Sequence, residues 1–518
     1  MREDCFLMED WKAQVGQRLV GGFPGKTISP EFIRLVREYK IGNVILFEHN
    51  VESMEQIKRL CGEIQELVRS QTGHGAFITI DQEGGGVTRL PENGCNVPGA
   101  MATTAAGDPE YAEILASLTA KELKSLGVNF NLAPSMDVNN NPLNPVIGVR
   151  SYSDRAETVA EYGIRAVKGY RKENFLACAK HFPGHGDTAV DSHLGLPVID
   201  KTLEELEQLE LKPFRAVIEG GIEAVMSSHI LFPRLEPDRI PCTMSKRIVT
   251  SILKERMGFR GLVLSDCMEM DAIQKYYGTA KGVAAAMAAG VDLVFVSHSQ
   301  ELLEESVLEV YRAVEEGRIS PEEMRASAEK IIAYKKRYVV NSVPEEGCSG
   351  KDREKEREIR RKSIVLTQGK LFPVGKNTFF TGCPGFRATL ASSVDDRTVN
   401  FAEYLAKGFG ARGLITSKDP DGAEISRVLS VLEGAESVVV STYNGHLQPG
   451  QRKLVEALGE QGIPLLVVAL RNPYDLADLP ENATGIAAWD NSLETLELLT
   501  ELLRGEWQPE GRMPVGLT

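Results

Sequence analysis

The first two thirds of the chain alternate short apolar, β-branched runs with amphipathic helical stretches. This alternation predicts a parallel sheet covered by helices, and hence an α/β fold class. Eight such runs are present, and eight parallel strands close a barrel. We therefore predict a (β/α)8, TIM-like barrel. The predicted strands are QRLVGGF, NVILF, FITID, FNLAPSMDV, LACAKHF, AVMSSHI, GLVLSD and DLVFVS.

Each predicted strand starts apolar and delivers a polar or charged residue at or just beyond its end. In a (β/α)8 barrel these ends surround the mouth in which active sites are built. Strand ends are polar wherever loops begin, but loop starts rarely supply so many His, Lys and Asp residues in one register. We therefore favour a catalytic mouth over ordinary loop polarity. Its residues are Glu48, His49, Asp81, Asp137, Lys180, His181, His229, Asp266, Ser297 and His298.

A second, smaller domain is predicted beyond the barrel. The barrel takes residues 1–340, and residues 341–360 are rich in Gly, Pro, Ser and charges, as expected of a linker that runs into a solvated helix. Residues 361–518 again alternate apolar strands with helical stretches, which predicts a doubly wound α/β sandwich. This part has neither a GxGxxG turn nor a GxxxxGK loop, so nucleotide binding is not supported.

Charge and cysteine usage narrow the class of partner. The formal net charge of −14 disfavours nucleic acid and anionic membranes, because both are polyanions. The opening stretch MREDCFLMEDWKAQVGQRL breaks its apolar residues with charges, so we expect neither a signal peptide nor a membrane span. The eight cysteines are scattered without a CxxC pair, as in reduced cytosolic proteins, so a structural zinc site is not expected. We expect a cytoplasmic protein.

The stretch KHFPGHGDTAVDSH, residues 180–193, concentrates chemistry-bearing residues in one loop. His181, His185 and His193 could ligate zinc, but they lie in a loop punctuated by Gly and Pro, with no HxxxH on a helix, so a metal-dependent hydrolase is the weaker interpretation. Asp191 lies two residues before His193, and a carboxylate beside an imidazole favours the protonated ring. His193 is therefore a candidate proton donor, unless Asp191 merely caps its own turn.

A second group follows the predicted strand GLVLSD, which places Asp266 at the barrel mouth with little freedom to move. Such a carboxylate is suited to attack on an electrophilic carbon, which forms an ester that water later hydrolyses. Alone, a carboxylate at a strand end is weak evidence. Together with an acid loop on another strand, it provides the two groups that retaining glycoside cleavage requires.

These motifs resemble those of the family 3 glycoside hydrolases, and in particular their β-N-acetylglucosaminidase branch, whose loop reads KH(F/I)PGHGxTxxDSH. KHFPGHGDTAVDSH matches that pattern throughout. The resemblance continues in DQEGGGVTRL, NFNLAPSMDV, NPVIGVRSYS and LSDCMEM. It also covers the second domain, through LVVALRNPYDL and RGEWQPEGRMPVGL, so nearly the whole chain is included.

The resemblance implies roles for individual residues. Asp266 corresponds to the nucleophile, and His193 with Asp191 to the dyad that acts as general acid and base. No metal or cofactor is implied. Charge-assisted hydrogen bonds are the strongest contacts available to a neutral sugar. The positions that match sugar-binding ones are Asp81, Arg89, Arg150, Lys180 and His181.

The implied function is a cytoplasmic, exo-acting, retaining β-N-acetylglucosaminidase that acts on cell-wall fragments or chitooligosaccharides. A β-N-acetylglucosaminide phosphorylase with the same residues is the alternative, because a histidine acid has no negative charge to repel phosphate. The second domain is expected to brace the barrel or to shape the leaving-group side. Two positions depart from the pattern: Gly86 stands where arginine is common, and Cys267 where a second aspartate is common.

Overall fold

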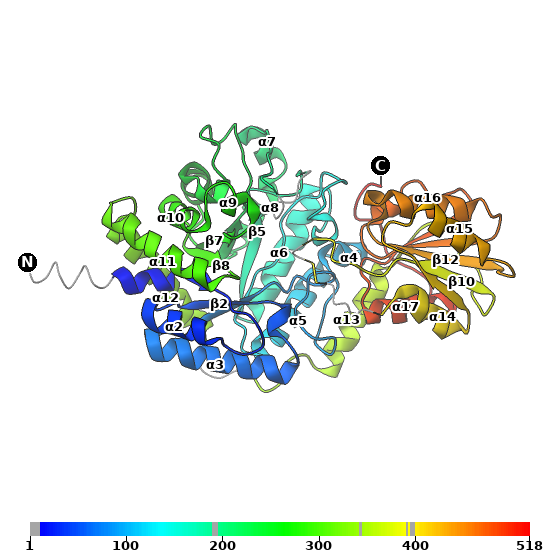
Figure 1. The fold of residues 1–518 in the computed structure, drawn as a ribbon, viewed down its shortest axis with the longest axis horizontal. Helices are drawn as coiled ribbons and strands as arrows, with labels where there is room; N and C mark the ends of the chain where they lie inside the picture. The colour runs from blue at the N-terminus through cyan, green and yellow to red at the C-terminus, as the bar shows by residue number, and fades with distance from the viewer. Residues whose placement is uncertain (1–10, 189–194, 341–343, 390–391, 394–398, 518) are drawn as a thin grey trace, which may run out of the picture.

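The computed structural model describes residues 11–188, 195–340, 344–389, 392–393 and 399–517. In this part of the chain eight parallel strands close a barrel in chain order, as predicted (Figure 1). The strands are β1 (Leu19–Gly21), β2 (Asn43–Leu46), β3 (Phe77–Ile80), β4 (Phe130–Asn131), β5 (Leu176–Phe182), β6 (Ala224–Ser227), β7 (Leu262–Cys267) and β8 (Leu293–Val296).

The strands alternate between two apolar environments. In β2, Ile45 packs inside the barrel, whereas Val44 and Leu46 face the helices outside. In β7, Leu262 packs inside and Val263 outside. Because successive side chains point to opposite faces of a strand, runs that are apolar at every position fill both the interior and the outer layer.

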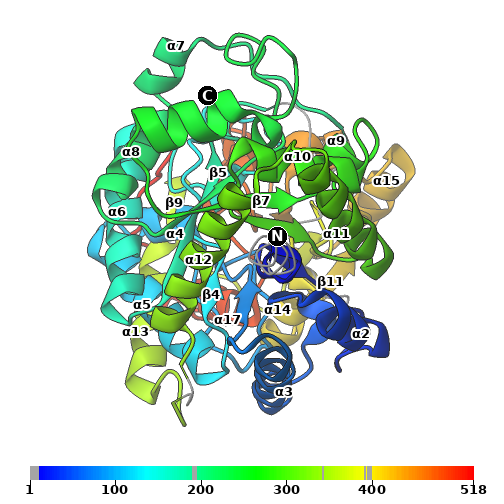
Figure 2. The same ribbon diagram turned by 90° about the vertical axis from the view of Figure 1, so that its left-hand side faces the viewer.

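Helices surround the strands, and the second domain lies behind the barrel in the view of Figure 2. Ser320 begins α12 with a capping box to Glu323, which satisfies two backbone donors of the first turn. The helices are α2 (Pro30–Tyr39), α3 (Met54–Thr72), α4 (Ala100–Ala105), α5 (Glu110–Ser125), α6 (Ala156–Lys172), α7 (Leu203–Gln208), α8 (Leu211–Glu219), η4 (Arg247–Arg256), α9 (Asp271–Gln274), α10 (Thr279–Ala289), α11 (Gln300–Glu315) and α12 (Pro321–Tyr338), with short turns at η1 (Glu48–Asn50), η2 (Gly148–Arg150) and η3 (Cys242–Met244).

The fourth strand is shorter than its sequence suggests. The apolar run over 130–138 predicts one long strand, but β4 ends at Asn131. Pro134 has no backbone N–H to donate to a ladder, so regular pairing stops before it. The chain continues beside β5 through a single bridge between Ser135 and Lys180, and this irregular path carries Asp137 to the barrel mouth.

The second domain is a six-stranded sheet with the order β11-β10-β12-β13-β14-β9. Its strands are parallel except β9, which runs antiparallel to β14 and was not predicted. Alternate residues of the central strands pack on α15 and α16 on one face and on α14 and α17 on the other. Figure 1 shows these two pairs of helices on opposite sides of the sheet. The elements are β9 (Val365–Gln368), β10 (Thr378–Gly382), α14 (Phe401–Phe409), β11 (Arg412–Ile415), α15 (Gly422–Ser430), β12 (Ser437–Thr442), η5 (Gly445–Leu447), α16 (Pro449–Gly459), β13 (Leu465–Ala469), η6 (Pro473–Leu476), β14 (Ala483–Ala487) and α17 (Leu493–Leu503).

The helix α13 (Gly350–Ser363) joins the two domains and occupies most of the predicted linker. It is not solvated all round, because Ile359 and Arg360 are buried. Arg360 donates to the Asp490 carboxylate at 2.9 Å and to the Asn96 carbonyl at 2.5 Å, so it bonds to both domains at once. The exact domain boundaries stay a prediction.

Direct bonds also join the domains. The Asn139 amide donates to the Tyr474 hydroxyl at 2.7 Å, and the Ser153 hydroxyl donates to the Pro514 carbonyl at 2.6 Å. These residues are buried, so the contacts are shielded from water. Among the described residues, no helix is long and apolar enough to cross a membrane.

Candidate active site

A cavity of about 860 Å³ opens at the carboxyl ends of the barrel strands. Most of the polar residues predicted at the strand ends line it, whereas Asp137 and His229 lie behind its wall. The six described residues that the sequence assigned to catalysis or sugar binding also line this cavity. They are Asp81, Arg89, Arg150, Lys180, His181 and Asp266.

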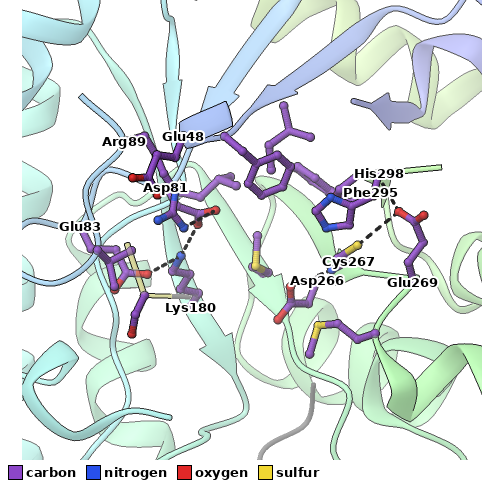
Figure 3. A pocket seen from close by; sticks show the side chains of 18 of the residues that line it. Glu48, Asp81, Glu83, Arg89, Lys180, Asp266, Cys267, Glu269, Phe295 and His298 are labelled. Atoms are coloured by element: carbon purple, nitrogen blue, oxygen red, sulfur yellow. Dashed lines mark hydrogen bonds and ion pairs between the residues drawn. The ribbon is translucent and has the colours of Figure 1, made fainter. Parts of the chain in front are cut away.

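A buried charge cluster forms one side of the cavity (Figure 3). Lys180, in β5, lies 2.7 Å from a carboxylate oxygen of Asp81, after β3, and 2.7 Å from one of Glu83. Arg150, in η2, donates to both oxygens of Glu83 at 2.9 and 2.8 Å. Burial disfavours the Lys180 ammonium, but Asp81 and Glu83 outweigh burial and raise the pKa of Lys180. The cluster therefore keeps its charges and holds its donors and acceptors in fixed positions.

Arg89 connects this cluster to the second domain. Its guanidinium lies 4.0 Å from Asp81 and donates to the hydroxyl of Ser393. The pKa of Arg89 is lowered by burial, against which Asp81 and Glu83 act. The barrel loop that carries Arg89 is thus held by a residue from the other domain.

Asp137 organises the histidines of the KHFPGHG stretch. One carboxylate oxygen lies 2.7 Å from Nδ1 of His181, and the other accepts the backbone N–H of His185 at 2.7 Å. Burial opposes ionisation of Asp137, but His181 and His185 hold its pKa at about 2. A carboxylate at Nδ1 fixes the ring, and Nε2 of His181 faces the Arg150 guanidinium at 3.4 Å. Burial lowers the pKa of His185 to about 4, so this ring is neutral near pH 7.

Asp266 lies at the end of β7, across the cavity from Lys180 and Asp81 in Figure 3. One of its oxygens accepts the backbone N–H of Cys267 at 2.7 Å. The Cys267 carbonyl lies 2.9 Å from Nε2 of the buried His229. The carboxylate of Asp266, the candidate nucleophile, is therefore positioned by the backbone of Cys267. His229 in turn contacts the carbonyl of Cys267.

A second possible metal cluster lies beside Asp266. The ligand atoms of Cys267, Glu269 and His298 lie within 4.8 Å of one another. However, the two Glu269 oxygens accept the backbone N–H groups of His298 and Ser299 at 2.7 Å, where α11 begins. We assign Glu269 to capping this helix start, a common use of a carboxylate at unsatisfied N–H groups.

Glu83 belongs to the site, although it was not among the residues predicted from the sequence. It ion-pairs with Arg150 and Lys180, and Arg150 holds its pKa well below the ordinary value even though burial opposes this. Its position two residues after Asp81 was a usable signal, because in an extended segment both side chains can project to the same side. Asp191 and His193 lie outside the described residues, so their roles stay predictions.

Comparisons with known proteins agree with this geometry. The Glycosyl hydrolase family 3 N terminal domain matches residues 13–334. Beta-hexosaminidase A of Pseudoalteromonas piscicida is 34% identical over 339 residues, which are 61% of this chain and 57% of that protein. Beta-hexosaminidase of Xylella fastidiosa (strain 9a5c) is 35% identical over 288 residues, 54% of this chain and 84% of that protein.

Solved structures resemble this chain over both domains together. The glycoside hydrolase family 3 beta-N-acetylglucosaminidase from Paenibacillus sp. str. FPU-7 superposes with a TM-score of 0.91 and 37% identity, over 98% of this chain and 99% of that one. Three findings point to the same family. The family domain matches more than half of the sequence, the barrel has the expected charged mouth, and the solved structure resembles both domains. The chain belongs to glycosyl hydrolase family 3.

Proposed function

We propose that the protein is an exo-acting, retaining β-N-acetylglucosaminidase that removes the non-reducing terminal N-acetylglucosamine. The observation that carries this proposal is the anchored Asp266 carboxylate facing the charge cluster across one cavity. The names of the relatives, beta-hexosaminidase and beta-N-acetylglucosaminidase, support the choice of sugar.

In the first step, an Asp266 oxygen attacks the anomeric carbon and the bond from that carbon to the leaving oxygen breaks. His193, charged and oriented by Asp191, gives its proton to the leaving oxygen. In the second step, the neutral His193 takes a proton from water while the water oxygen attacks the same carbon and releases Asp266. The acid and base roles rest on the DSH motif.

The charge cluster suits the terminal sugar. Lys180 and Arg150 supply donors to hydroxyl groups, and Asp81 supplies acceptors, all held by ion pairs that do not need the substrate. Such preformed sites avoid the entropy cost of ordering long side chains on binding. We propose cell-wall fragments or chitooligosaccharides as substrates, in the cytoplasm.

Phosphorolysis with the same residues is the second candidate. The feature that favours it is the histidine in the DSH motif, because a neutral imidazole does not repel phosphate from the intermediate as a carboxylate would. A metal-dependent hydrolase is less well supported, because Nδ1 of His181 already faces Asp137 and His185 Nδ1 contacts Thr188 at 2.9 Å.

The test is turnover of nitrophenyl β-N-acetylglucosaminide, β-glucoside and β-xyloside, each with and without phosphate. We expect preference for the acetamido sugar. Free N-acetylglucosamine as product in both conditions supports hydrolysis, whereas the sugar 1-phosphate formed in phosphate identifies the phosphorylase. Equal turnover of all three glycosides, or activity that EDTA abolishes and zinc restores, would contradict the proposal.

A further inference from the structure

A second cavity, of about 600 Å³, lies between the domains. It shares the lining residues Glu48, Val51 and Arg89 with the cavity at the barrel mouth, here called the reaction cavity, so the two cavities adjoin one another.

On the far side, this interdomain cavity is lined by residues that follow the strands of the second sheet. Tyr443 follows β12, Arg471 follows β13, and Asn491 follows β14. The parallel strands have the order β11-β10-β12-β13-β14. From β10 the chain adds β11 on one side and then β12, β13 and β14 on the other, so the strand order reverses between β10 and β12. Doubly wound sheets of this order bind ligands outside the carboxyl ends of their strands. The ligand edge of the second sheet therefore faces the mouth of the barrel.

Arg471 places a buried positive charge in the wall of this cavity. Its side chain is only 3% exposed, and its guanidinium donates to the Tyr443 hydroxyl at 3.2 Å and to the Ser392 hydroxyl at 3.0 Å. Ser392 also lines the reaction cavity, so Arg471 lies where the two cavities meet. Both bonds are to neutral groups.

Among the residues the structure describes, no carboxylate lies within 4.0 Å of the Arg471 guanidinium. Other buried arginines that line these cavities do have such partners: Arg89 has Asp81, Arg150 has Glu83, and Arg360 has Asp490. A buried cation without a counter-ion is costly, and an anion brought to it recovers that cost.

Within the described part of the chain, the acidic residues that line the interdomain cavity form no ion pair with Arg471. Asp490 is bonded to Arg360, and each of the remaining carboxylates lies beyond 4.0 Å from Arg471. These remaining carboxylates belong to Glu48, Glu52, Glu92 and Glu494. They also limit the charge of a bound anion, because a ligand with several negative charges would be repelled.

We propose that Arg471 binds an oxyanion of the ligand in the interdomain cavity, and so makes the second domain part of the substrate site. The oxyanion is a carboxylate on the leaving-group sugar or a free phosphate, since a guanidinium binds both by the same paired N–H geometry. This inference rests on the proposed function, because it takes the reaction cavity as the site of the terminal sugar.

The experiment compares the wild type with Arg471→Gln and Arg471→Lys. Arg452→Gln is the matched control, because Arg452 is an exposed arginine of the same domain, paired with Asp478 at 3.2 Å. The substrates are two disaccharides of β-linked N-acetylglucosamine, one with a neutral N-acetylglucosamine leaving group and one whose leaving group carries a lactyl ether carboxylate. Nitrophenyl β-N-acetylglucosaminide with and without phosphate completes the set.

For Arg471→Gln we expect kcat/KM on the acidic disaccharide, relative to the neutral one, to fall about 10- to 100-fold, the loss typical of one hydrogen bond to a charged group. Arg471→Lys should recover part of that ratio, and Arg452→Gln should leave it unchanged. A loss confined to phosphate-dependent turnover supports the oxyanion site with phosphate as its source.

Equal losses on every substrate, or no change on any, would overturn the proposal. Circular dichroism and the melting temperature separate a folding defect from a binding defect. Calorimetric titration with the free lactyl-ether sugar and with inorganic phosphate provides a readout without turnover. If the wild type binds either anion and Arg471→Gln does not, the site stands even where the nitrophenyl glycoside is not cleaved, so failure of the proposed function would be recognised separately.

Discussion

At the scale of single residues, an Asp266 oxygen accepts the backbone N–H of Cys267, and the side chain of Asp266 is not part of the apolar core. We predict that Asp266→Ala reduces turnover of the nitrophenyl glycoside by at least about 10³-fold, because the carboxylate that forms the covalent intermediate is lost. The melting temperature should change little. Added azide or formate should restore part of the turnover by occupying the vacated space. Near-normal activity in a folded variant would remove Asp266 from the role of nucleophile.

The role of His193 as proton donor is tested by comparing substrates with different leaving groups. A sugar alkoxide departs only with a proton, whereas nitrophenolate departs unaided, so His193→Ala should impair the natural disaccharide about 10²- to 10⁴-fold more than the first step with a nitrophenyl substrate. Asp191→Ala should give the same order with a smaller difference, because it removes only the group that orients and charges the ring. Stopped-flow measurement of nitrophenol release and product analysis of the disaccharide provide the comparison. An equal loss on both would show that the proton comes from elsewhere.

Sequence analysis could not predict residues whose roles depend on partners far away in the chain. Asp81, Lys180 and Asp266 could be predicted because each ends an apolar strand. Glu83 could not be paired with Arg150, 67 positions away, without the fold. Gly86 is a similar case: a Cβ at this position would lie 3.0 Å from the Arg471 guanidinium. The Arg471 guanidinium of the other domain thus lies next to the position at which the resemblance implies an arginine.

At the scale of elements, the eight barrel strands could be predicted because each is a continuous apolar run bounded by polar residues. The departures have local causes. Pro134 ends the ladder of β4 early, and β9 is a short antiparallel edge strand with only one of its four residues buried, so periodicity gave it little signal. The buried side of α13 includes Arg360, a charged residue whose partners lie in two other segments.

The helix α12 buries Lys335 under the barrel. The Lys335 ammonium donates to the Gln17 side chain at 2.8 Å and to the Gly42 carbonyl at 2.9 Å, and burial lowers its pKa to about 7. The unfolded chain keeps an ordinary lysine pKa of about 10.4, so between about pH 7 and 10 the unfolded state binds more protons and stability rises with pH. Below pH 7 both states are protonated, and the burial penalty is complete.

We therefore predict that the free energy of unfolding of the wild type, measured relative to Lys335→Met, rises between pH 7 and 10 by up to about 1.4 kcal/mol per pH unit. Urea unfolding of both proteins across this range is the measurement. Taking the difference removes the contributions of other groups that titrate alike in both. A difference that is flat with pH would show that Lys335 titrates normally in the folded protein.

At the scale of the whole molecule, Ser393 and Tyr474 of the second domain and Arg360 of the joining helix hydrogen-bond to loops of the barrel. We predict that a barrel ending at residue 340 loses solubility or melts at a clearly lower temperature, and that its kcat/KM falls although no catalytic group is removed. Arg360→Gln in the full chain should weaken the brace alone. A soluble barrel with full activity would show that the interface is dispensable.

If Arg471 binds the leaving group as proposed, recognition of the substrate is divided between the two domains. In this proposal the terminal sugar and the chemistry belong to the barrel, whereas the leaving group contacts the second domain, which a different stretch of chain encodes. Preference for one leaving group over another can then change by substitution in the second domain, or by its exchange between relatives, without disturbing the reaction. A chimaera with this barrel and a relative's second domain should keep its choice of terminal sugar and adopt the relative's choice of what that sugar is attached to.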